Sequence, residues 1–193
     1  GNDISVETAV MERRHLAGSK DVSSRLSERL EQELISEDDD YFGLKEMEQN
    51  NRHRQFQNVD YGLEPNIKNS PGGLRDIHTV MWIALKRHKT TSKRELIKLG
   101  VITKTESRLL AAAEKFLRHT RFGLHLISRN KEDRLRFMYQ RELSTKLDYR
   151  GSAGKPDVEK FMQKYYRHVL AIQEINTIVI QSFRENLSKI SEP

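Results

Sequence analysis

Glycine and proline are concentrated in one stretch of the chain, Tyr61 to His78. These eighteen residues contain three of the ten glycines and two of the four prolines. Pro65 and Pro71 restrict the backbone, whereas Gly72 and Gly73 permit positive φ angles and the close approach of another group. Most of the remaining sequence has apolar residues at the three- and four-residue spacing of helices. The sequence therefore predicts an all-α helical bundle that carries one structured Pro/Gly-Gly loop.

Apolar spacing and capping patterns predict where the helices lie. Helices are expected over residues 5–15, 21–34, 41–57, 74–88, 93–99, 104–128, 140–147 and 156–187, with a short extended segment at 134–137. Asp21 is the expected N-cap of the second helix, and Ser92 and Thr103 each precede a glutamate at capping-box spacing. We expect one helical domain over 1–193, with N-terminal helices in 1–57, the loop in 58–73 and a bundle in 74–187.

Composition excludes several classes of protein. Cysteine is absent, which excludes a disulfide scaffold, thiol catalysis and cysteine-based zinc sites. The sequence contains no run of eighteen apolar residues and no signal-peptide pattern at its start, so we expect a cytoplasmic protein without a membrane span. The formal net charge of +6 suits anionic ligands, but acidic residues interrupt the basic ones throughout, so nucleic-acid binding is not expected.

The loop delivers Gly72 and Gly73 to the start of a helix. Unpaired backbone N–H groups and the positive end of the helix dipole favour anions at such a place. Lys68 and Arg75 flank the two glycines and add positive charge. The sequence thus predicts an anion site here, and the alternative is a plain Pro-Gly-Gly turn before a helix.

A longer string identifies a family. Glu64 to His78, read as Glu-Pro-Asn-Ile-Lys-x-Ser-Pro-Gly-Gly-Leu-Arg-Asp-Ile-His, resembles the signature of the bifunctional uridylyltransferase/uridylyl-removing enzymes that modify the signal protein PII. Glu12–Gly18, Arg121–Leu126 and Gln140–Leu143 also resemble segments of that family. The similarity extends over nearly the whole chain, from about residue 3 to residue 187.

The resemblance implies an enzyme that transfers UMP from UTP to a tyrosine of PII in nitrogen regulation. In this family a preceding sheet carries a Gly-Ser turn and paired aspartates that hold Mg²⁺, and a later domain carries a His-Asp motif for uridylyl removal. Neither pattern occurs in this chain, where Asp38 and Asp40 have the spacing but not the context. The chain is therefore expected to be an internal helical region without catalytic or metal-binding residues, inactive alone and associated with the missing domains.

By the same resemblance, the helical domain closes over the catalytic sheet and its loop contacts UTP. Lys68 and Arg75 would neutralise phosphate charge, and the Gly72 and Gly73 amides would point at phosphate oxygens. Asp76 would cap the helix start, orient Arg75 or reach the metal through water, with capping ranked first. Asn66, together with Glu64, would contact the base or ribose.

Two interpretations compete with this nucleotide site. The loop could instead dock the bundle onto the missing sheet, or a basic face could make the chain an adaptor that binds PII. Arg118, Arg121 and His125 share one helix face, which would meet phosphate, an acidic neighbour or solvent. His53, between Arg52 and Arg54, is read as a basic helix C-terminus.

Overall fold

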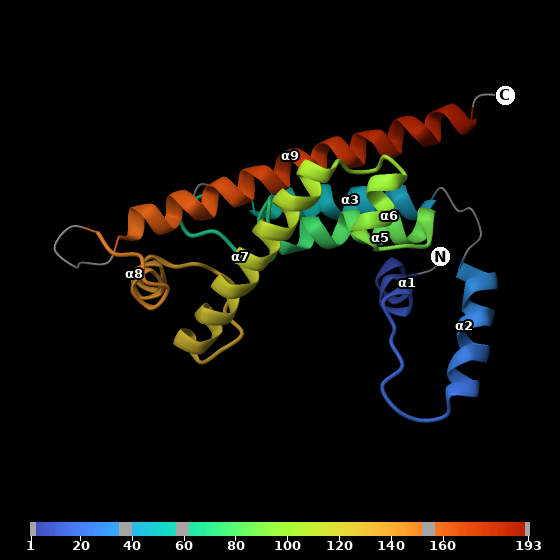
Figure 1. The fold of residues 1–193 in the computed structure, drawn as a ribbon, viewed down its shortest axis with the longest axis horizontal. Coiled ribbons are helices and arrows are strands. Elements are labelled where there is room, and N and C mark those ends of the chain that lie inside the picture. Colours follow the sequence, from blue (N-terminus) through green and yellow to red (C-terminus); the bar gives the residue numbers. More distant parts are fainter. Residues whose placement is uncertain (1–2, 35–39, 57–61, 152–156, 192–193) are drawn as a thin grey trace.

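The computed structural model describes residues 3–34, 40–56, 62–151 and 157–191. Its helices are α1 (Ile4–Met11), α2 (Lys20–Leu34), α3 (Asp40–Phe56), α5 (Leu74–His88), α6 (Lys93–Lys98), α7 (Lys104–Ser128), α8 (Phe137–Lys146) and α9 (Val158–Ser191) (Figure 1). Asn66 and Arg134 pair at an isolated antiparallel bridge. The prediction of an all-α fold is confirmed.

The longest helix, α9, organises the bundle. It runs the length of the molecule and packs against α7, α5 and α8, while α3 lies alongside α5 (Figure 1). The short helix α6 packs on α7, and α1 packs on α5 and α3. The amphipathic α2 stands beside α1 at one end, apart from the main body (Figure 1). The Pro/Gly-Gly loop enters the bundle directly before α5.

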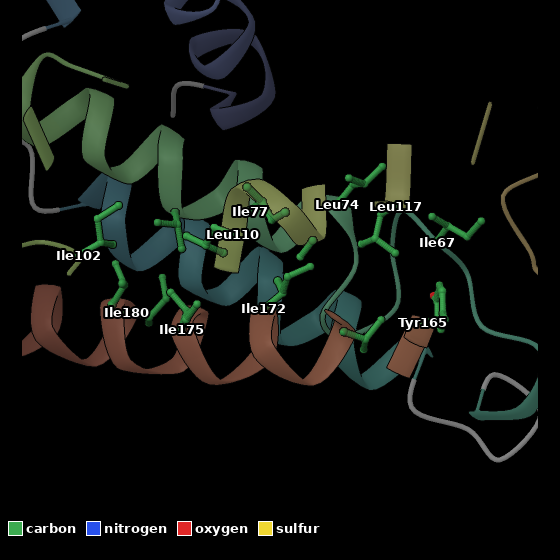
Figure 2. Close-up of a cluster of buried hydrophobic side chains, with 14 of the residues drawn as sticks. Ile67, Leu74, Ile77, Ile102, Leu110, Leu117, Tyr165, Ile172, Ile175 and Ile180 are labelled. Atoms are coloured by element: carbon green, nitrogen blue, oxygen red, sulfur yellow. The ribbon is translucent and has the colours of Figure 1, made fainter. Parts of the chain in front are cut away.

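The apolar core lies between α5, α7 and α9. Ile77, Leu117 and Ile172 represent these three helices in it, each with at most 2% of its surface exposed (Figure 2). Ile67 of the loop is fully buried in the same cluster. Burying a side chain of this size stabilises a fold by roughly 1.5–3 kcal/mol. Ile67 therefore anchors the loop in the core as firmly as a helical residue would.

The buried face of α3 is polar, which the sequence did not predict. Tyr41, Lys45 and Gln49 recur every four residues and are buried, whereas the apolar side chain of Met47 is 54% exposed. The Lys45 ammonium pairs with Glu48 at 2.7 Å and lies 4.6 Å from the centre of the Trp82 ring. Buried helix faces were predicted from apolar spacing, and a polar face such as this one has no apolar spacing.

Of the two capping boxes predicted from the sequence, one is present in the structure. The capping box of Thr103 and Glu106 is confirmed, with both reciprocal hydrogen bonds present. Ser92 precedes α6 but its side chain makes no capping hydrogen bond. There Glu95 instead accepts a hydrogen bond from the Thr90 hydroxyl.

The first two helices differ from their predicted limits. α1 ends at Met11 rather than at residue 15, with Glu12 as its C-cap. Asp21 lies within the first turn of α2 and is not its N-cap. The Ser19 hydroxyl accepts from the Val22 N–H at 3.5 Å, so the chain turns into the helix two residues earlier than expected. Asp38 and Asp39 lie outside the described residues.

Candidate functional site

A turn built around Asn66 begins the loop. Its side-chain oxygen accepts from the N–H groups of Lys68, at 3.1 Å, and Asn69, at 2.8 Å. Its own N–H donates to the Ser70 hydroxyl at 2.9 Å. Asparagine side chains often form such turns. The oxygen that was expected to contact a base or ribose is thus used inside the loop.

The amides of the Gly-Gly corner point inward. The Gly72 N–H donates to the Asp76 carboxylate at 2.7 Å, and the Gly73 N–H donates to the Ser70 carbonyl at 2.8 Å. The next two amides, of Leu74 and Arg75, also donate to loop carbonyls, at 3.1 and 2.9 Å. The prediction that these amides bind an external anion is therefore wrong, because the protein supplies its own acceptors.

Gly72 is required for packing against α9. Its φ is +75°, and a Cβ there would lie 2.4 Å from the Val169 carbonyl oxygen and 2.6 Å from the Val169 Cγ1. A side chain would therefore meet both backbone strain and a steric clash. The close approach predicted for this glycine exists, but its partner is a helix of the same chain.

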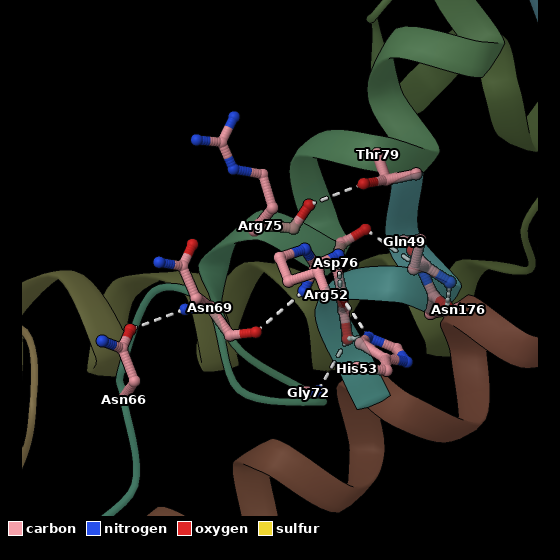
Figure 3. A network of polar contacts seen from close by, with 10 residues as sticks. All are labelled: Gln49, Arg52, His53, Asn66, Asn69, Gly72, Arg75, Asp76, Thr79 and Asn176. Carbon is pink, nitrogen blue, oxygen red and sulfur yellow. Dashed lines mark hydrogen bonds and ion pairs between the residues drawn. The ribbon is translucent and has the colours of Figure 1, made fainter. Parts of the chain in front are cut away.

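Asp76 is the centre of a buried polar network (Figure 3). Its carboxylate is fully buried and accepts from Arg52 Nη2 at 2.7 Å and from His53 Nε2 at 2.9 Å. Arg52 also donates to the Asn69 carbonyl at 2.9 Å. Together with the Gly72 contact, these bonds join α3, the loop and the first turn of α5. The Asp76 carboxylate thus accepts from the turn before α5, whereas the N-cap residue of α5, Gly73, has no side-chain capping hydrogen bond.

The network continues to α9 through a pair of amides. Gln49 and Asn176 exchange hydrogen bonds of 2.8 and 3.0 Å, and Asn176 also donates to the Asp76 carbonyl at 3.1 Å. Because buried polar groups need partners, these residues specify how α3, α5 and α9 meet. From the sequence alone, Arg52 and His53 are predicted to form a basic helix end. Their partner lies more than twenty positions away, and the polar spacing along α3 was the one available signal.

The side chains of Lys68 and Arg75 are both partly exposed. The Arg75 guanidinium lies 5.2 Å from the centre of the Trp82 ring, and Figure 3 shows it extending away from the Asp76 network. Across the described ranges, neither cation forms an ion pair with a carboxylate.

A second ionic cluster is centred on Asp133, in the segment between α7 and α8 that runs beside the loop. Asp133 pairs with Arg121 at 2.7 Å and with His125 at 3.0 Å. Burial raises the pKa of the Asp133 carboxyl, but the hydrogen bonds from these two residues outweigh it, and the net pKa is below the ordinary range. Arg118 pairs with Glu114 at 2.7 Å. The face of α7 that carries Arg118, Arg121 and His125 therefore contacts acidic side chains.

Glu64 belongs to this second cluster as well. It pairs with Arg134 at 3.2 Å and accepts from the Phe137 N–H at 2.9 Å. Glu64 was expected to contact a base or ribose, but its carboxylate instead joins the loop to the start of α8. Both acceptors proposed for the nucleoside, Asn66 and Glu64, thus have structural partners.

The described residues do not form a Mg²⁺ site. Among the described residues, no three His, Cys, Asp or Glu side chains are grouped as metal ligands would be. Both Asp76 oxygens already accept from Arg52, His53 and the Gly72 amide. The described residues therefore present no ready set of Mg²⁺ ligands.

Comparison with known proteins decides the family. The family described as GlnD PII-uridylyltransferase matches residues 41–180. The chain belongs to this family. The matched range contains the Pro/Gly-Gly loop, the Asp76 network and most of the core of this PII-uridylyltransferase family member.

Individual relatives support the same assignment. Bifunctional uridylyltransferase/uridylyl-removing enzymes of Pseudomonas fluorescens (strain SBW25) and Stutzerimonas stutzeri (strain A1501) are 39% and 41% identical over 183 residues, which is 95% of this chain. The corresponding enzyme of Azotobacter vinelandii is 40% identical over the same length. The chain spans about a fifth of the length of these relatives. Within the described ranges, every helix is too short or too polar to cross a membrane.

Proposed function

We propose that this chain is the nucleotide-contacting helical part of a cytoplasmic PII uridylyltransferase. The whole enzyme would transfer UMP from UTP to a tyrosine of PII in nitrogen regulation, with Mg²⁺ bound by a catalytic domain outside this chain. Lys68 and Arg75 would contact the triphosphate of UTP held mainly by that domain. The fragment alone would be inactive.

The observation that carries this proposal is that two partly exposed cations, Lys68 and Arg75, have no carboxylate partner among the described residues and lie on a rigid support. Stacking on Trp82 holds the Arg75 guanidinium at the surface, so little side-chain freedom is lost when it binds phosphate. The Asn66 turn and the buried Ile67 fix the backbone on either side of Lys68. The Asp76 charge is compensated by Arg52, so Lys68 and Arg75 are not neutralised by it.

The test is calorimetric titration of the chain with UTP in the presence of Mg²⁺. We expect Lys68→Ala and Arg75→Ala each to weaken binding about tenfold, because each removes a charge-assisted contact to phosphate. Lys115→Ala, at an exposed position on α7, is the matched control and should bind UTP as the unchanged chain does. Equal affinity in all four proteins would contradict the proposal.

A second function is favoured by the inward amides. Because the Gly-Gly corner satisfies its own hydrogen bonds, it also suits a rigid surface that docks against a protein. The chain would then be an adaptor for PII or for the catalytic domain, without a nucleotide site. Binding of PII in the absence of nucleotide, unchanged by Lys68→Ala, would favour this alternative.

A further inference from the structure

A separate cavity lies at the other end of α5. It has a volume of about 530 Å³ and is formed by α2, the end of α1, residues 13–15 and the last turn of α5. Figure 1 shows α2 beside α1, connected by the irregular segment that carries these residues. Small-molecule pockets commonly have volumes of roughly 300–1,000 Å³. The cavity therefore has the size of a ligand site.

One side of the cavity is cationic. Arg13, Arg14 and His15 follow one another in the irregular segment, and Lys86 of α5 and Lys89 directly after it also line the cavity. The described residues that line the cavity include no carboxylate. Lys86 also forms an ion pair of 2.7 Å with Glu7, which does not line the cavity. In the part of the chain that the structure describes, the side chains of Arg14 and His15 form no hydrogen bond or ion pair.

The opposite side of the cavity is apolar with hydroxyl groups. Ser23, Leu26, Ser27 and Leu30 lie at positions i, i+3, i+4 and i+7 of α2, so they share one helix face. Leu26 is 51% exposed although it belongs to the apolar face of an amphipathic helix. Water contacts apolar surface here that a ligand would cover, which favours binding of a molecule with an apolar part.

The geometry points to a binding site for an organic phosphate with an aromatic or apolar body. The guanidinium groups of Arg13 and Arg14 suit the bidentate binding of phosphate, and the α2 hydroxyls add hydrogen bonds. Leu26 and Leu30 would cover the body of the ligand. Eleven positions of α5 separate Arg75 from Lys86, roughly 16 Å along the helix axis. This site is therefore distinct from the UTP contact proposed for Arg75 and does not depend on it.

The test uses phenyl phosphate, which combines one phosphate with one aromatic ring. We expect calorimetric titration of the chain at low salt to show binding that weakens about tenfold in Arg14→Gln and at least about threefold in Leu26→Gln. Inorganic phosphate lacks the apolar body and benzyl alcohol lacks the charge, so each should bind at least about tenfold more weakly. Arg141→Gln, at an exposed position of α8, is the matched control and should bind normally.

Three results would overturn this inference. The first is no binding of phenyl phosphate up to about 10 mM, a concentration that corresponds to a very weak site. The second is the same affinity in the chain, Arg14→Gln and Arg141→Gln, because the contact would then not involve the cavity. The third is loss of binding in Lys68→Ala but not in Arg14→Gln, which would assign the ligand to the loop. Circular dichroism of each variant checks that its helices are intact.

Discussion

The carboxylate of Asp76 lies where water does not reach it, with none of its surface exposed. A buried charge is tolerated when it is paired and hydrogen-bonded, and here Arg52, His53 and the Gly72 amide supply the partners. Removing one member of such a group costs more than the pair contributes, because the other charge is left without a partner. Asp76 is thus the most informative single residue to change.

We expect Asp76→Asn to lower the free energy of unfolding by about 3 kcal/mol. The amide keeps the shape of the side chain but leaves Arg52 and His53 without their anion. Urea unfolding followed by circular dichroism measures the change. Asp148→Asn is the control, because the ion pair of Asp148 with Arg150 is about three-quarters exposed and should contribute less than about 1 kcal/mol. Similar losses in both variants would show that the network does not stabilise the fold.

At the scale of elements, the loop and α9 meet through Gly72. We expect Gly72→Ala to lower the free energy of unfolding by about 3 kcal/mol or more, because a methyl group would strike the Val169 carbonyl and the backbone φ is positive. Gly100→Ala separates these two causes. Gly100 has nearly the same φ, +72°, and a Cβ there would meet no atom within 4 Å.

The alanine at position 100 should therefore cost only the backbone strain, about 1 kcal/mol. The difference between the two variants, read from their urea midpoints, measures the contact with α9. If both variants lose the same stability, the approach of Gly72 to Val169 contributes nothing.

The sequence predicted the elements better than it predicted what joins them. Helix positions follow from apolar spacing, and the Thr103 capping box follows from residues three positions apart. Arg52, the partner of Asp76 on α3, is far from it in the sequence, and no local sequence pattern predicts that the two side chains meet. The free amides were wrongly predicted because one residue three positions into α5 supplies its own carboxylate.

At the scale of the whole molecule, three histidines give the fold a dependence on pH. Burial is the main cause that lowers the pKa values of His78, His88 and His168 below the ordinary 6.5. Neighbouring cations add to this effect, as Arg75 does beside His78. The folded protein therefore resists protonation at positions where the unfolded chain accepts it.

We expect the free energy of unfolding to fall as the pH is lowered from about 7.5 to about 5.5. Below the ordinary pKa of histidine the unfolded chain binds more protons than the folded one, so the contribution is complete above that value and is lost below it. Urea midpoints at the two pH values measure the decrease. His78→Gln should make it smaller, and His119→Gln, at an exposed position, should not. Equal midpoints at both pH values would contradict this expectation.

Trp82 is the only tryptophan in the chain, and it lies against the side chain of Arg75. Indole emission responds to charge and solvent within a few ångströms of the ring. All of the intrinsic tryptophan fluorescence of this protein therefore originates beside the candidate contact residue. The chain carries its own optical reporter for the surroundings of Arg75, and no label has to be introduced to read it.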